Sequence, residues 1–321
     1  MSEFKTGSHA GILHHYAPSL VAFEFSPQPA STSTPTSPPP KNTLLFINGL
    51  GGGLLTLPYT TRLSRALPAT YTFVEVLLTS SYSGWGTGSV ARDAQELAQC
   101  VSYFRALKPS GGKIVLLGHS TGCQDTVEYL TGKGCEGRPG VDGAVLQAPV
   151  SDRQAVRTTL GEEKLREGIA AARKLIEGGR GEEILPKDLT RDELGEAPCS
   201  ALRWYSLTAY PKDGDSAGVD SEDFFSSDLP DSYIRGIFGR IPRKTPLCIL
   251  ASGSDQFVPS FVDKKALVET WVRAVKDGGG VVDEIHSGVV EGATHCFIGV
   301  PEEVLGDFIG RVVGFLQGLE G

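Results

Sequence analysis

The chain has 321 residues and carries 30 Lys and Arg against 38 Asp and Glu, which gives a formal net charge of −8. This acidic balance argues against a nucleic-acid-binding protein, which usually presents a basic face. No apolar run approaches the ~20 residues that span a bilayer, so we expect no membrane partner, and the N-terminal residues do not match a secretory signal. Glycine is the one unusual count, at 40 residues, about twice the usual share of ~7%.

The cysteines are scattered along the chain without a close pair. They are Cys100, Cys123, Cys135, Cys199, Cys248 and Cys296. The sequence contains no Cys-x-x-Cys pattern and no zinc-type spacing, so we expect reduced thiols and no metal site. This usage predicts a cytoplasmic location. A chain of this length can bury its core as a single domain, which we expect to span residues 1–321.

The predicted elements begin with a strand at residues 20–25, which are rich in β-branched and aromatic side chains. Residues 26–40, SPQPASTSTPTSPPP, hold six prolines and almost nothing apolar. Such a composition cannot bury enough surface to order itself. We therefore expect a disordered loop between two early strands at 26–40.

Short continuous apolar runs predict five further strands, at residues 43–47, 71–78, 113–117, 143–147 and 246–251. Continuous rather than alternating apolar strands are typical of a parallel sheet covered on both faces. Apolar residues at helical spacing predict helices at residues 92–107, 260–276 and 302–316. Alternating units of this kind predict an α/β fold with a mostly parallel, doubly wound sheet.

A long segment at residues 152–242 interrupts this alternation. Roughly 90 residues far exceed a normal connection between two core strands. Residues 154–177 have the pattern of a charged amphipathic helix, and residues 203–231 mix aromatic side chains with an acidic loop. An insertion here would lie over the carboxyl ends of the strands, where open α/β sheets bind ligands. We expect it to form a lid.

The strongest chemical motif is Gly118-His-Ser120-Thr-Gly122. It follows an apolar strand and opens a helix-like run at residues 125–130, the strand–turn–helix setting of a nucleophile elbow. The two glycines fit a strained turn that brings helix and strand close together. This context favours Ser120 as a nucleophile over a structural turn serine.

A serine nucleophile needs a base and an orienting acid later in the chain. Asp255 follows the apolar run 246–251, and His295 follows the strand-like residues 281–290 and precedes the last helix. The three residues therefore occur in the expected order along the chain, Ser, then Asp, then His. His286 is the rival base, and Asp152 is the rival acid, although either acid could instead cap a helix.

The glycine-rich residues 48–53, NGLGGG, follow the strand at 43–47. An oxyanion hole needs the N–H group after the nucleophile, here that of Thr121, and a second N–H from the loop after an early strand. We assign the second to Leu50 or Gly51. A phosphate-binding loop is disfavoured because the Walker lysine and the G-x-G-x-x-G spacing are missing.

Four aromatic residues are candidates for contact with a substrate: Trp85, Trp204, Tyr205 and Phe297. Trp85 follows an early strand, and Trp204 and Tyr205 lie in the expected lid. Packing between lid and core is the alternative explanation for these side chains. Cys123 and Cys296 are each close in sequence to a proposed catalytic residue, and they could be small pocket-wall side chains.

The elbow and the ordered Ser–Asp–His set resemble the α/β-hydrolase superfamily across residues 20–317. More narrowly, residues 11–24 (GILHHYAPSLVAFE), 46–53 (FINGLGGG) and 117–125 (LGHSTGCQD) resemble a fungal family of α/β-hydrolases of unknown function. That family includes intracellular siderophore esterases that open fusarinine C and triacetylfusarinine C. The resemblance implies an α/β-hydrolase fold and a serine esterase without a cofactor. Its substrate would be a small-molecule ester, and any iron would arrive with that substrate.

Two other functions remain open. A carboxylesterase or thioesterase for another hydrophobic acyl substrate would share every residue named above and differ in the lid. A non-catalytic ligand-binding protein on a hydrolase scaffold would need a degenerate triad, whereas Ser120, Asp255 and His295 are all present.

Overall fold

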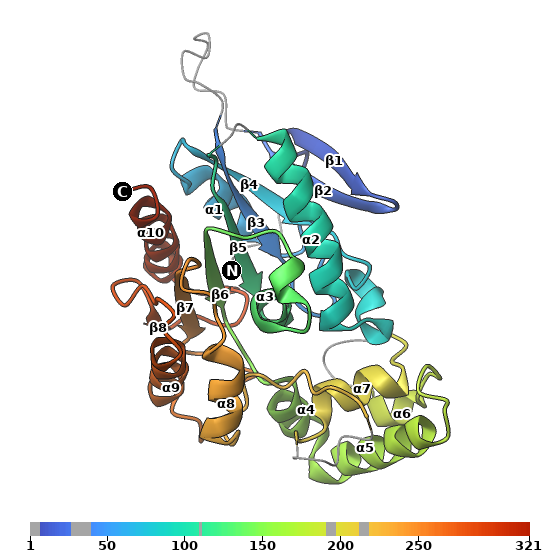
Figure 1. Ribbon diagram of the computed structural model, residues 1–321. Coiled ribbons are helices and arrows are strands. Elements are labelled where there is room, and N and C mark those ends of the chain that lie inside the picture. Colours follow the sequence, from blue (N-terminus) through green and yellow to red (C-terminus); the bar gives the residue numbers. More distant parts are fainter. Residues whose placement is uncertain (1–6, 27–39, 109–110, 191–196, 212–217) are drawn as a thin grey trace.

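A computed structural model describes residues 7–26, 40–108, 111–190, 197–211 and 218–321 (Figure 1). The loop expected at residues 26–40 lies outside the described residues, apart from its two end positions. The described chain forms one central sheet with helices on both faces and a group of helices at one end.

The sheet has eight strands in the order β1-β2-β4-β3-β5-β6-β7-β8. The strands are β1 (Gly11–Ala17), β2 (Leu20–Phe25), β3 (Asn42–Ile47), β4 (Tyr71–Val76), β5 (Ile114–His119), β6 (Gly143–Gln147), β7 (Leu247–Ser252) and β8 (Gly288–Val290). β2 is antiparallel to both β1 and β4, and the remaining pairs are parallel. The predicted mostly parallel α/β sheet is confirmed, and the predicted strands from 20–25 to 246–251 agree with it to within two residues at each end.

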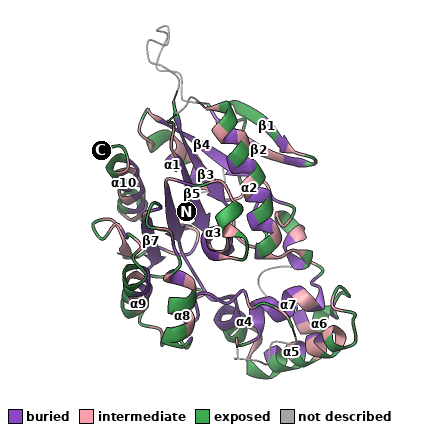
Figure 2. Cartoon of the chain, in the orientation of Figure 1, coloured by how far each residue is buried: buried purple, intermediate pink, exposed green. Residues whose placement is uncertain are grey.

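Helices cover the two faces of the sheet as the alternation of side chains along each strand requires. In β3, Leu45 and Ile47 join a core with helices α2 (Val90–Leu107), α3 (Thr121–Thr131), α8 (Asp231–Phe238) and α9 (Lys264–Asp277). Leu44 and Phe46 point the other way, into a core with α1 (Thr60–Ala66) and α10 (Glu302–Gly318). Figure 2 shows the resulting pattern, with buried central strands and helices that expose one side.

The segment at residues 152–242 divides into two parts. Helices α4 (Asp152–Leu160), α5 (Glu162–Glu177), α6 (Lys187–Thr190) and α7 (Ala201–Thr208) form a lobe at one end of the sheet (Figure 1). This lobe has its own apolar cluster, which includes Leu165 and Trp204. Helix α8 instead belongs to the layer on the sheet, where Phe238 stacks on Trp271 of α9 with ring centroids 6.0 Å apart.

Two local expectations were wrong and one strand was missed, each for a physical reason. The helix expected at 154–177 is broken at Gly161, whose φ of 85° ends α4 and begins α5. The strand-like residues 281–290 contribute only β8 and one isolated bridge at Val282, because a turn held by Asp283 occupies the middle. Strand β1 was missed because it is an edge strand with exposed apolar side chains, which hides the usual alternation.

Candidate active site

Ser120 occupies a tight turn between β5 and α3. Its backbone has φ 55° and ψ −125°, a conformation that side-chain-bearing residues rarely adopt. A Cβ on Gly118 would lie 2.1 Å from the carbonyl oxygen of Gly122, and a Cβ on Gly122 would lie 2.2 Å from the carbonyl oxygen of Ile47. The turn therefore requires glycine at both positions, as the motif predicted.

Replacing Gly122 with alanine should distort this turn. The neighbouring carbonyl belongs to Ile47 in the central strand β3, which cannot move aside easily, so the serine must shift instead. We expect a loss of about 1–3 kcal/mol in the free energy of unfolding and of about 100-fold in kcat/KM for a simple ester. Urea denaturation and p-nitrophenyl acetate turnover measure the two effects.

Gly310→Ala is the matched control, because a Cβ at that position of α10 meets nothing within 4 Å. We expect unchanged kcat/KM in that variant. Full activity of Gly122→Ala would show that the turn tolerates a side chain.

Asp255 and His295 form a buried pair on the loops that follow β7 and β8. The Nδ1 atom of His295 lies 2.7 Å from Oδ2 of Asp255, and both side chains are almost fully buried. Because a carboxylate can only accept, Nδ1 carries the proton and Nε2 is left as the basic nitrogen. Oδ1 of Asp255 accepts the backbone N–H of Phe257 at 3.0 Å, and the Phe257 ring lies edge-on to His295 at 4.8 Å.

Ser120 and His295 line the same cavity, which has a volume of about 320 Å³. The structure thus brings together the predicted nucleophile and the predicted histidine with its acid. The rival base His286 lies in a turn, where its Nδ1 is 2.7 Å from Asp283. The rival acid Asp152 does line the cavity, but its carboxylate accepts from Gln124 rather than from His295.

The glycine-rich loop after β3 packs directly on the serine. A Cβ on Gly49 would lie 2.6 Å from Cβ of Ser120, so this close approach requires glycine. The Asn48 side chain holds the loop, since its Oδ1 accepts the Gly49 N–H at 2.9 Å and its Nδ2 donates to the Gly53 carbonyl at 3.0 Å. Leu50 and Gly51 line the cavity.

The predicted oxyanion donors have free N–H groups. Within the described part of the chain, the N–H groups of Leu50 and Thr121 have no hydrogen-bond acceptor. Thr121 is the first residue of α3, where the helix itself supplies no acceptor. Leu50 lines the cavity, and Thr121 directly follows the cavity residue Ser120 in the chain, so both remain candidates for binding an oxyanion.

A buried polar layer that the sequence analysis missed lies beneath the cavity. Oε1 of Gln147 accepts from the Tyr59 hydroxyl at 2.9 Å and from Nδ1 of His119. Burial, with the nearby His295 acting in the same direction, lowers the pKa of His119 to about 3, so this imidazole stays neutral. A polar residue at the end of the apolar run 143–147 was the available signal for Gln147.

The four aromatic side chains predicted to contact the substrate are not among the residues that line the cavity. Trp85, Trp204 and Tyr205 are buried in the apolar cluster of the α4–α7 lobe. Phe297 packs against Tyr59 and Phe308 in the core under α10. They fill gaps between elements, which was the alternative explanation for them. The apolar cavity wall consists instead of Leu50, Leu57, Val150, Ala155 and Phe257.

Two thiols lie near the site. Cys296 lines the cavity, with its Sγ 3.8 Å from Nε2 of His119. Burial raises the pKa of the Cys296 thiol to about 11, and burial also raises that of Cys123. Both thiols are therefore protonated at neutral pH and are weak nucleophiles.

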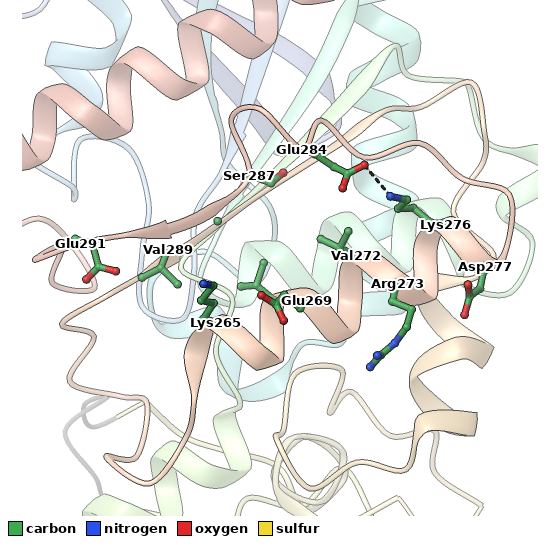
Figure 3. A pocket seen from close by; sticks show the side chains of 12 residues that line it. Lys265, Glu269, Val272, Arg273, Lys276, Asp277, Glu284, Ser287, Val289 and Glu291 are labelled. Carbon is green, nitrogen blue, oxygen red and sulfur yellow. Dashed lines mark hydrogen bonds and ion pairs between the residues drawn. The ribbon is translucent and has the colours of Figure 1, made fainter.

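A larger cavity of about 580 Å³ lies elsewhere, between α9 and residues 284–291 (Figure 3). Its wall alternates acidic and basic side chains, two of which, Lys276 and Glu284, pair at 2.7 Å. The Ser287 hydroxyl in this wall already accepts the Ile249 N–H at 3.0 Å. No histidine is among the described residues that line it, so it lacks the base that a serine nucleophile needs.

No helix in the described part of the chain combines the length and apolar character needed to cross a bilayer. The described residues also contain no group of three or more His, Cys, Asp or Glu side chains placed to hold a metal ion.

Comparisons with known proteins place the chain among known relatives. A family model described as "Protein of unknown function (DUF1749)" matches residues 1–317. The fusarinine C esterase sidJ of Aspergillus fumigatus is 36% identical, with 98% of this chain and 97% of the relative covered. The structure of the siderophore hydrolase EstB from Aspergillus fumigatus matches with a TM-score of 0.77 and 34% identity over 98% of each chain.

A further structure, an α/β-hydrolase fold protein of unknown function, matches with a TM-score of 0.59 at 19% identity, over 98% of this chain and 97% of the other. At that identity the likeness concerns the fold alone. The predicted α/β-hydrolase fold is confirmed.

Proposed function

Because the chain belongs to the DUF1749 family and has the α/β-hydrolase fold, we propose that it is a serine esterase that hydrolyses the ester bonds of a hydroxamate siderophore of the fusarinine C type. The catalytic part of this proposal rests on the cavity shared by Ser120 and His295. Asp255 forms a hydrogen bond with Nδ1 of that histidine. The substrate class rests on the two relatives, which are named as a fusarinine C esterase and a siderophore hydrolase.

In the proposed mechanism, Nε2 of His295 takes the proton of Ser120 as Oγ attacks the ester carbonyl. The N–H groups of Thr121 and of Leu50 or Gly51 stabilise the oxyanion. The imidazolium then gives its proton to the departing alcohol, which leaves an acyl-enzyme. A water molecule, deprotonated by His295, hydrolyses that intermediate and restores the serine.

Two neighbours of His295, Asp255 and the neutral His119, support this cycle. Asp255 fixes the tautomer of His295 and stabilises its positive form. His119 lies 4.9 Å from His295, ring centroid to centroid, and a charge on it would oppose that positive form. The low pKa of His119 prevents this. Iron enters only as part of the substrate, and the mechanism uses no cofactor.

We also propose that the α4–α7 lobe acts as the lid of this single-domain enzyme, because Asp152 and Ala155 of α4 form part of the cavity wall. A cytoplasmic location fits the free state of all six cysteines. The net charge of −8 gives no support to a nucleic-acid partner.

Incubation with ferric fusarinine C and ferric triacetylfusarinine C, followed by mass spectrometry, tests the substrate. We expect ring-opened linear products that gain the mass of one water per cleaved bond, followed by smaller units. The catalytically impaired Ser120→Ala protein serves as the control for spontaneous hydrolysis.

Turnover of p-nitrophenyl esters and a siderophore-binding measurement, added to this experiment, separate the remaining alternatives. Cleavage of p-nitrophenyl esters with intact siderophores would assign the enzyme to another acyl substrate. Binding of the siderophore without turnover of any ester would indicate a non-catalytic binding protein.

A further inference from the structure

Asp152 places a carboxylate in the wall of the catalytic cavity. It is the first residue of α4, it is 6% exposed, and it lines the same cavity as Ser120. Its Oδ2 accepts a hydrogen bond from Nε2 of Gln124, which fixes its position. The residue takes no part in the mechanism described above, because Asp255 is the acid that bonds His295.

The remainder of the cavity wall offers no competing charge. It consists of the glycine-rich loop, apolar side chains, Ser120, Cys296 and two histidines. His119 is held neutral, and no lysine or arginine is among the described residues that line the cavity. Among the described residues that line this cavity, Asp152 therefore supplies the only carboxylate.

The groups behind Asp152 leave its negative charge partly uncompensated. Arg203 of α7 is the nearby cation, but its guanidinium bonds Glu222 and, at 2.9 Å, the carbonyl oxygen of Trp85. Asp223 and Glu222 also raise the pKa of Asp152, and each is itself paired with an arginine, Arg153 and Arg203 respectively. Burial raises the pKa of Asp152 to about 6, with Arg203 opposing this shift, so the carboxyl is ionised at neutral pH.

We propose that Asp152 is a specificity-determining residue that selects ester substrates carrying a positively charged nitrogen near the scissile bond. This inference rests on the proposed esterase function and adds a substrate class to it, namely esters with an ammonium group. A cation in the cavity would find one fixed carboxylate in a site of limited water access, where a charge pair is stronger than in bulk water.

The test uses two pairs of esters that differ only in charge. On the acyl side, the phenyl ester of 4-(trimethylammonio)butyrate is compared with that of 5,5-dimethylhexanoate. On the alcohol side, acetylcholine is compared with 3,3-dimethylbutyl acetate. For at least one pair, we expect Asp152→Asn to lower the ratio of kcat/KM for the charged ester to that for the neutral ester by about 10-fold or more. The intrinsic reactivity of each ester cancels in this comparison.

The pH dependence provides a second readout, because the trimethylammonio charge does not titrate. In the wild type, the ratio should fall as the pH drops through about 6 and the Asp152 carboxyl becomes neutral. In Asp152→Asn the ratio should not change with pH.

Asp231→Asn is the matched control. Asp231 is also the first residue of a helix, α8, but it is exposed and lies outside the cavity wall. We expect its ratio to equal that of the wild type. An equal ratio in Asp152→Asn for both ester pairs, with the neutral esters hydrolysed normally, would overturn the inference. Failure of the wild type to hydrolyse any ester would instead contradict the proposed function.

Discussion

Ser120→Ala should abolish ester hydrolysis while leaving the fold intact. The alanine removes the only atom that forms the acyl-enzyme, and the oxyanion donors and histidine that remain give little turnover by themselves. We expect kcat to fall by about 10⁴- to 10⁶-fold. The change is small in volume at a half-buried position, so the melting temperature should be close to that of the wild type. Steady-state turnover of p-nitrophenyl acetate and circular dichroism measure the two effects.

Ser102→Ala provides the control, since Ser102 is exposed on α2 and is not among the residues that line the cavity. A phosphonate ester that traps nucleophilic serines should add one phosphonyl group to the wild type and to Ser102→Ala, and none to Ser120→Ala. Activity of Ser120→Ala within 10-fold of the wild type would exclude the serine mechanism.

The elbow was predictable because its constraint is local. The strained turn at Ser120 and the close approach of Gly118 to Gly122 involve residues near one another in sequence, so a short motif describes them, although Gly122 also lies against Ile47 of β3. The positions of Asp255 and His295 followed from the order of strands, since the carboxyl ends of parallel strands meet at one edge of the sheet.

The cavity wall was not predictable, because it depends on packing between distant segments. Trp204 and Tyr205 are large and lie in the expected lid, yet the lobe needs them for its own small core. The wall takes Val150 and Ala155, which have no distinguishing pattern in the sequence. Likewise, Gly161 gave no signal of a helix break, since a single glycine is tolerated in many helices.

The second large expected loss of activity concerns Asp255, the acid that orients His295. Asp255→Asn should lower kcat/KM by about 10⁴-fold while the geometry stays intact. An asparagine amide can donate to Nδ1 of His295, which favours the tautomer with its proton on Nε2, and that nitrogen can then no longer accept the proton of Ser120. The lost carboxylate also no longer stabilises the imidazolium. Turnover of p-nitrophenyl acetate from pH 5 to 9 measures both effects.

The structure contains a second His–Asp pair of the same length, which makes a matched control. Asp283 lies 2.7 Å from Nδ1 of His286, as Asp255 does from His295, but in a turn outside the catalytic cavity. Asp283→Asn should reduce stability somewhat, because the carboxylate also accepts two backbone N–H groups, and it should leave kcat/KM unchanged. Loss of activity in Asp283→Asn with full activity in Asp255→Asn would make His286 the base. Since the two pairs share their chemistry and their hydrogen-bond length, they differ in the deeper burial of the His295 pair and in the cavity that His295 shares with Ser120.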